Sequence, residues 1–149
     1  MGAILSGDRI SDFGKIEVVL EDGLLEIPLK HRGLYSPSAG YVLRKTSEAQ
    51  SKHHPYIGVY TKERWDETLF LLAEGGANLA DFIKNKTKVE ARVVEGVHIL
   101  ALPEDCLKHL KLRGDIVTVL RSISPRIQLW APEEFREYER ILRYSVGFR

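Results

Sequence analysis

The chain has 149 residues, of which 44% are hydrophobic and 29% are charged, a composition typical of a globular protein and too apolar for intrinsic disorder. At this length roughly 68–70% of the surface of the unfolded chain can be buried, so the fold needs no disulfide or metal to hold it together. Its 22 basic and 21 acidic side chains give a formal net charge of +1, which excludes the strongly basic balance of many small nucleic-acid-binding modules.

The first half of the chain predicts short strands and helices in alternation. Residues 24–34 ("LLEIPLKHRGL") begin as a strand and run into Pro28, which stops ladder pairing and starts a helical turn. Further strands are expected at 41–44 and 57–60. Thr61 then offers a side-chain oxygen that can cap the first turn of a longer helix. The apolar face of that helix is formed by Trp65, Leu69 and Leu72.

The second half predicts the same elements after a linker. Gly75 and Gly76 break the first long helix, and residues 79–83 offer a second helical face. Residues 99–112 ("ILALPEDCLKHLKL") repeat the strand that runs into a proline, here Pro103. Strands follow at 115–121 and 127–130. Pro132 then suits the first position of a helix, where a missing N–H is no loss. The apolar face of this last helix is formed by Phe135, Tyr138 and Leu142.

The order strand, strand, short helix, strand, strand, longer helix therefore occurs twice. Chance resemblance between two β-α pieces is the alternative, but five features recur in the same order. We expect a first repeat at 13–74, a linker helix at 75–87 and a second repeat at 88–143. The fold class is then α+β and β-rich: two pseudo-symmetric halves whose hairpins interleave into one barrel-like core with helices outside. One half alone should not fold. The aromatic pairs expected in or beside the core are Tyr60/Trp65 and Trp130/Phe135.

This double unit resembles the MraZ family of bacterial regulators, and each half resembles an AbrB-type swapped-hairpin domain. The resemblance covers residues 13–138, from the aromatic-glycine opening at Phe13 and Gly14, and includes the endings "YIGVYTKERW" and "RIQLWAPEEF". It implies a transcription factor that forms ring-type homo-oligomers and reads short repeats in its own promoter, within a cluster of division and cell-wall genes. It also implies one reading loop per half, with an acidic residue, a glycine and an arginine at fixed positions.

Both reading loops depart from that pattern. In the first half, the acidic, glycine and arginine positions are taken by Glu21, Gly23 and Leu24. In the second half, they are taken by Glu95, His98 and Ile99. Arginine can make bidentate contacts with guanine or phosphate, and neither leucine nor isoleucine can do so. DNA affinity has therefore either disappeared or moved to other side chains.

Three basic side chains near the loops are candidates for relocated DNA contacts. Arg32 matches a basic residue common in the family, Lys30 lies beside it, and Arg92 ends the basic segment "FIKNKTKVEAR". A further basic cluster lies in the C-terminal segment "RILRYSVGFR". Basic side chains bind the phosphate backbone without reading sequence. The alternative for each cluster is an ordinary solvated surface.

The sequence gives little indication of metal binding or catalysis. His53 and His54 could begin a metal site, but the chain has no Cys or His spaced to complete one, so we expect a solvated loop before Pro55. Cys106, with His109 three residues on, is expected to be a packing residue of a short helix and not an activated nucleophile. We expect no enzyme activity, no metal, no cofactor and no small-molecule substrate.

The sequence therefore favours an oligomeric, DNA-binding transcriptional regulator, contacting DNA through some of Glu21, Gly23, Lys30, Arg32, Arg92, Glu95 and His98. An interaction or scaffold protein that kept the fold and no longer reads DNA is the alternative, because both arginine positions are apolar. An enzyme is a distant third. A single cysteine excludes an intrachain disulfide and suits a reducing, cytoplasmic setting at the nucleoid. No signal peptide and no membrane span are expected.

Overall fold

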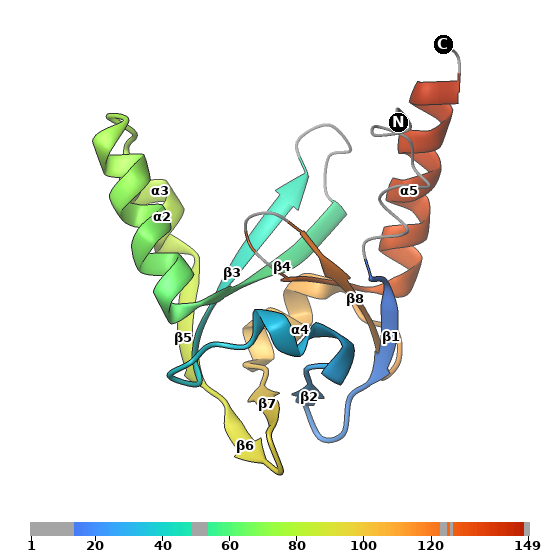
Figure 1. Cartoon of the computed structure of the whole chain (residues 1–149). Helices are drawn as coiled ribbons and strands as arrows, with labels where there is room; N and C mark the ends of the chain where they lie inside the picture. Colours follow the sequence, from blue (N-terminus) through green and yellow to red (C-terminus); the bar gives the residue numbers. More distant parts are fainter. Residues whose placement is uncertain (1–13, 49–53, 123–124, 126, 148–149) are drawn as a thin grey trace.

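The computed structural model describes residues 14–48, 54–122, 125 and 127–147. Phe13, His53 and the side chains of Leu142, Arg143 and Arg149 lie outside the described parts. The strands are β1 (Ile16–Val19), β2 (Leu24–Glu26), β3 (Gly40–Glu48), β4 (His54–Thr61), β5 (Lys86–Glu90), β6 (Arg92–Val94), β7 (Val97–Ala101), β8 (Ile116–Arg121) and β9 (Ile127–Trp130). The helices are the 3₁₀ helix η2 (Leu29–Leu34), α2 (Lys62–Glu74), α3 (Leu79–Lys84), α4 (Glu104–Leu110) and α5 (Pro132–Gly147) (Figure 1).

The strands form two antiparallel sheets, which confirms the α+β, β-rich class. The larger sheet has six strands in the order β1-β8-β9-β4-β3-β5, and the smaller has three in the order β2-β7-β6. Strands from the two halves of the chain pair with each other in both sheets: β1 with β8, β5 with β3, and β2 with β7. No closed barrel is detected among the described strands. The core matches the expected barrel-like core only in that both halves of the chain contribute to it.

A single apolar core contains side chains from both sheets. The small sheet contributes Leu25 and Leu100, and the large sheet contributes Leu43, Ile57 and Leu129, all essentially inaccessible to solvent. At about 25 cal/mol per Å² of apolar surface, each such side chain contributes roughly 1.5–3 kcal/mol to folding. The core therefore depends on both halves of the chain.

Two aromatic clusters lie beside this core, and they confirm the expected burial of the aromatic pairs. Tyr60 and Trp65 pack edge to face at 5.1 Å, and Phe82 of α3 stacks on Trp65 at 5.0 Å. Trp130 and Phe135 pack in the same manner at 5.4 Å, in a second cluster. The clusters fix α2 and α5 to the large sheet, and the two helices stand at the left and right of the molecule in Figure 1.

The two long helices begin as expected. The Thr61 hydroxyl accepts a hydrogen bond from the backbone N–H of Arg64 at 3.0 Å, which caps α2. Pro132 occupies the first position of α5, and Glu133 and Glu134 follow in its first turn, where the helix dipole favours negative charge. None of the described helices is long and apolar enough to cross a membrane.

Candidate nucleic-acid interface

Two hairpin turns project from the same end of the molecule (Figure 1). In the first turn, Asp22 and Gly23 have φ values of 54° and 77°; in the second, Glu95 and Gly96 have φ values of 51° and 80°. A two-residue hairpin loop with positive φ at both central positions is a type I′ turn, which suits the twist of the flanking strands. Each half of the chain therefore presents one turn of the same kind.

The register of the small sheet makes Leu24 and Ile99 equivalent. Leu25 pairs with Leu100, and on either side of that pair Leu24 lies opposite Ala101 and Glu26 lies opposite Ile99. Because successive side chains of a strand point to opposite faces, and Leu25 and Leu100 are buried, Leu24 and Ile99 lie on the outer face of the sheet. The two positions that the resemblance assigns to arginine thus share one apolar surface.

His98 lies inside the protein. Its Nδ1 is 2.7 Å from the hydroxyl of Tyr41, and its ring stacks on that of Tyr35 with the ring centroids 4.2 Å apart. The Tyr41 hydroxyl accepts from the backbone N–H of Ser36 at 2.9 Å, so its own proton is free to donate to His98. Burial lowers the pKa of His98 and raises the pKa of Tyr41 to about 12. His98 is therefore a neutral structural link, and the glycine of the second turn is Gly96.

The other predicted DNA-binding residues are exposed, except for the half-buried Gly23, and they divide into two groups. Glu21, Gly23 and Glu95 belong to the two turns, and Arg92 lies on β6 next to the second turn. Lys30 and Arg32 lie on η2, which follows β2 directly. The turns themselves are acidic, since Asp22 accompanies Glu21 in the first and Glu95 lies in the second. Acidic side chains repel phosphate, so the hairpin geometry suits DNA better than its charge does.

Sequence reasoning missed the side chains that support and surround this end. Tyr35 donates to the carbonyl of Ile27 at 2.9 Å, and with Tyr41 it holds His98 in place. Val94 and Val97 pair beside the second turn and extend the outer apolar surface. The alternation of outer and buried residues along 97–101 was the available signal, because it shows which side chains share a face.

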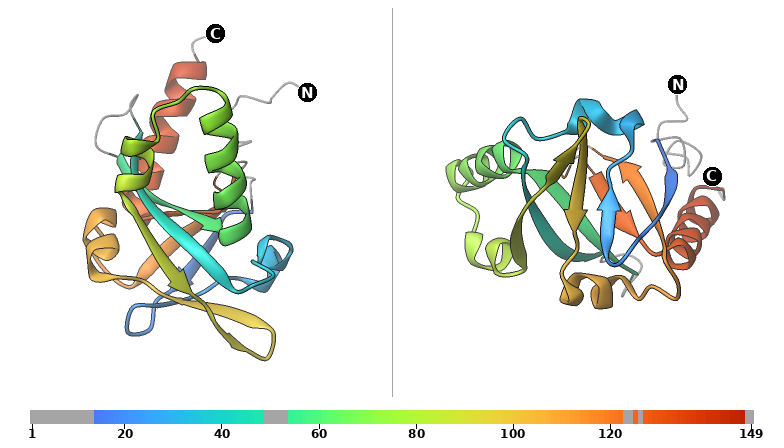
Figure 2. Two further views of the ribbon diagram at one scale, coloured as in Figure 1. Left: turned by 90° about the vertical axis from the view of Figure 1, so that its left-hand side faces the viewer. Right: turned by 90° about the horizontal axis from the view of Figure 1, so that it is seen from below.

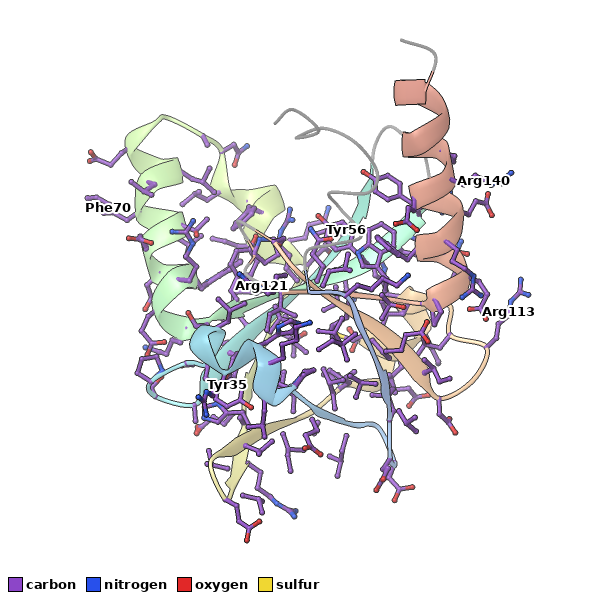
Figure 3. The ribbon with its side chains drawn as sticks, turned by 45° about the vertical axis from the view of Figure 1, so that its right-hand side comes forward. Tyr35, Tyr56, Phe70, Arg113, Arg121 and Arg140 are labelled. Carbon is purple, nitrogen blue, oxygen red and sulfur yellow. The ribbon has the colours of Figure 1, made fainter. Side chains whose placement is uncertain are left out.

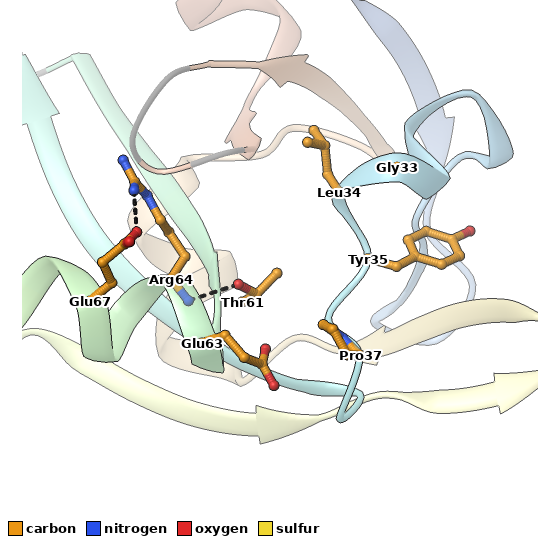
Figure 4. A pocket seen from close by; sticks show the side chains of 8 residues that line it. All are labelled: Gly33, Leu34, Tyr35, Pro37, Thr61, Glu63, Arg64 and Glu67. Carbon is orange, nitrogen blue, oxygen red and sulfur yellow. Dashed lines mark hydrogen bonds and ion pairs between the residues drawn. The ribbon is translucent and has the colours of Figure 1, made fainter.

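A cavity of about 300 Å³ lies between the segment after η2 and the start of α2 (Figure 4). Most of its polar groups have partners, and the exception is Nε of Arg64, which is buried without one. The Arg64 guanidinium pairs with Glu67, and the Ser36 hydroxyl donates to Glu63 at 2.8 Å. Hydrogen bonds from Ser38 and Ser36 lower the pKa of Glu63. This arrangement is a network that braces a loop against α2, and it presents no nucleophile with an adjacent base.

The two remaining candidates for chemistry have different outcomes. Cys106 is fully buried, and this desolvation raises the pKa of its thiol to about 11, which confirms a packing role.

The solvated loop expected at His54 is wrong: this residue begins β4, is 8% exposed, and its Nδ1 lies 3.0 Å from Glu134 Oε1 of α5. The sequence could not show this contact, since the two residues are far apart in the chain. Among the described residues, no group of three or more His, Cys, Asp or Glu could hold a metal ion.

Comparison with known proteins gave no match to a family model, a curated protein or a solved structure.

Proposed function

We propose that this protein is a homo-oligomeric, DNA-binding transcriptional regulator of the MraZ type, built from two AbrB-like swapped-hairpin halves. The observation that carries the proposal is the strand order of the large sheet, β1-β8-β9-β4-β3-β5. Each strand of the first half has a counterpart in the second: β1 corresponds to β5, β3 to β8 and β4 to β9. When each label is replaced by its counterpart, the same order is obtained in reverse. Such a palindrome is expected of two halves that have exchanged their hairpins.

The register of the pairing supports the same symmetry. In the large sheet, Gly58 lies opposite Gln128, with the pairs Ile57↔Leu129 and Val59↔Ile127 on either side. In the small sheet, Leu25 and Leu100 lie at the centre of an equivalent set. The two sets relate Leu24 to Ile99 and Ile57 to Ile127, whereas the turns differ in position, because the second hairpin is two residues longer and turns at Gly96.

DNA contact is assigned to the basic side chains around these turns. Arg92, Lys30 and Arg32 are exposed and carry charges suited to phosphate. Because one subunit has a net charge of only +1, several subunits must act together; linking weak sites can raise avidity by ~10²–10⁴. We place this regulator in the cytoplasm at the nucleoid, acting on a cluster of division and cell-wall genes.

A gel shift on the DNA upstream of its own gene, repeated across a salt series, tests the proposal. The parent chain should shift this DNA at low salt. Lys30→Ala with Arg32→Ala should weaken binding and flatten the salt dependence by up to ~0.9 log unit for each phosphate that the variant no longer neutralises. Lys62→Ala with Arg136→Ala, which removes two exposed charges from α2 and α5, is the matched control. No shift by the parent at low salt would contradict DNA binding.

A second candidate is an oligomeric interaction or scaffold protein that kept the fold and no longer reads DNA. The acidic turns and the apolar Leu24 and Ile99 favour it, because a surface of this kind binds protein more readily than phosphate. The same gel shift separates the two candidates.

A further inference from the structure

The outer face of the small sheet is largely apolar, and none of the described helices or strands covers it. It lies at the centre of the view from below in Figure 2. Pairing and alternation place five apolar side chains on this face: Leu24, Val94, Val97, Ile99 and Ala101. Leu24 is 37% exposed and Val94 is 40% exposed. An apolar face of this kind, on a sheet whose other face is already packed on the core, is typical of a protein-binding surface.

Two opposite charges flank the centre of this face. Ile99 on the central strand β7 lies opposite Glu26 of β2 on one side and opposite Arg92 of β6 on the other. The three residues form one row across the sheet. At a strand spacing of about 4.8 Å, the acidic and the basic side chains start about 10 Å apart. A row of glutamate, isoleucine and arginine is complementary to a second copy of itself turned by 180°, because the glutamate of each copy then faces the arginine of the other.

We propose that the outer face of the small sheet docks on the same face of a second copy of this chain, about a two-fold axis parallel to β7. Rotation about that axis lays β2 of one copy over β6 of the other. Glu26 then faces Arg92 of the second copy, and this ion pair occurs twice. In this dimer Arg92 is engaged by Glu26, so the phosphate contacts of the proposed regulator are made by Lys30 and Arg32. Ile99 meets Ile99 of the second copy at the centre. The contact is isologous and closes at two subunits.

The size of the face sets the strength of the dimer. β7 has five residues and β2 and β6 have three each, so the face covers roughly 180 Å² at usual strand dimensions. Stable interfaces bury ~800 Å² on each partner, so this contact should be weak and depend on concentration. Sheets pack face to face about 10 Å apart, a gap that facing glutamate and arginine side chains can span. Exclusion of water from the apolar centre would strengthen the two ion pairs.

Sedimentation equilibrium without DNA, from micromolar to millimolar concentration, tests the contact. The parent should associate reversibly, and Ile99→Lys should raise the dissociation constant at least tenfold, because it places two positive charges together on the axis. Phe70→Lys is the matched control: Phe70 is a 63% exposed apolar residue on α2, away from the small sheet (Figure 3), and its replacement should leave this constant unchanged.

Charge reversal gives a sharper test. Glu26→Arg alone sets arginine against arginine at both ion pairs, and Arg92→Glu alone sets glutamate against glutamate, so each variant should associate more weakly than the parent. Mixing the two variants should restore association, because the mixed dimer has opposite charges at both positions. Only contact between copies predicts this restoration; a charge effect within one subunit does not.

Three results would overturn the proposal: a parent that stays monomeric at millimolar concentration, an Ile99→Lys variant that associates like the parent, or a mixture no more associated than its components. Any association through other surfaces is common to all the variants, so the comparison among them isolates this face. Failure of the Ile99→Lys comparison or of the mixing test leaves the proposed DNA binding intact, and a failed gel shift leaves the dimer intact. A parent that stays monomeric would also count against DNA binding, because that proposal needs several subunits.

Discussion

The hydroxyl of Tyr41 lies 2.7 Å from Nδ1 of His98, so a buried hydrogen bond joins β3 of the first half to β7 of the second. Tyr41 is 2% exposed and His98 is 9% exposed. A proton added to this imidazole would create a charge in an environment that solvates it poorly. The link between the halves therefore depends on a neutral histidine.

The first prediction concerns pH. Burial lowers the folded-state pKa of His98 and of His31 below the ordinary value of 6.5. Between each folded pKa and 6.5, the unfolded chain binds more protons than the folded chain. The stabilisation is thus complete above pH 6.5 and is lost as the pH falls toward the folded pKa values, with a slope of up to about 1.4 kcal/mol per pH unit for each histidine.

Urea unfolding between pH 7.5 and 4.5 measures this slope. Replacing His31→Leu, or His98→Phe together with Tyr41→Phe, should flatten it, and the double replacement leaves no unpaired hydroxyl behind. Slopes identical to that of the parent would show that neither histidine is responsible.

The second prediction concerns the shared core. A chain cut between Gly75 and Gly76 should give two fragments that are each poorly folded, because β1 then lacks β8 and β5 lacks β3. Mixing the fragments should restore the circular dichroism signal of the intact chain. Separate cooperative melts of the two isolated fragments would rule out the shared core.

The third prediction concerns the turns. Gly96→Ala should destabilise the protein by about 1–2 kcal/mol, because φ at Gly96 is +80° and an L-residue is strained there. Gly33→Ala is the matched control: no atom lies within 4 Å of an added Cβ, and φ is not in the left-handed region. It should be neutral or stabilise by up to about 1 kcal/mol, since it reduces the entropy of the unfolded chain. Thermal unfolding measured side by side distinguishes them.

The fourth prediction concerns the arginine positions. Leu24→Arg together with Ile99→Arg should raise affinity for the upstream DNA and steepen its salt dependence, because both side chains are on the outer face near the turns. Leu24→Gln with Ile99→Gln controls for the loss of apolar surface. Equal binding by the arginine and glutamine variants would show that this face does not meet DNA.

Local signals in the sequence predicted the starts of the two long helices, whereas no range was predicted for β1, β5 or β6. Thr61 caps α2 and Pro132 opens α5 because each depends only on neighbouring backbone. The aromatic pairs were also recognisable, since Tyr60 and Trp65 are separated by one strand end and one helical turn. These features recur in both halves, and for this reason the sequence predicts a repeat.

Contacts between residues far apart in the chain were harder to predict from the sequence. The resemblance assigned His98 to the glycine position of the second loop, whereas the second hairpin is two residues longer and turns at Gly96. His54 was expected in solvent because nothing near it in sequence shows that Glu134 lies beside it. The charge row of Glu26, Ile99 and Arg92 exists only after β2, β7 and β6 have paired.

The pairing of β1 with β8 also has a consequence for how the protein is made. Ile16 cannot pair with Val119 until about a hundred more residues have been synthesised, and β3 cannot gain β5 until the linker has left the ribosome. At about 5–20 residues per second, the growing chain carries an unpaired β1 for roughly 5–20 seconds. During that interval β1 of one nascent chain can accept β8 of a neighbour translated from the same message, so polysomes are the place where this protein is most prone to exchange strands between copies.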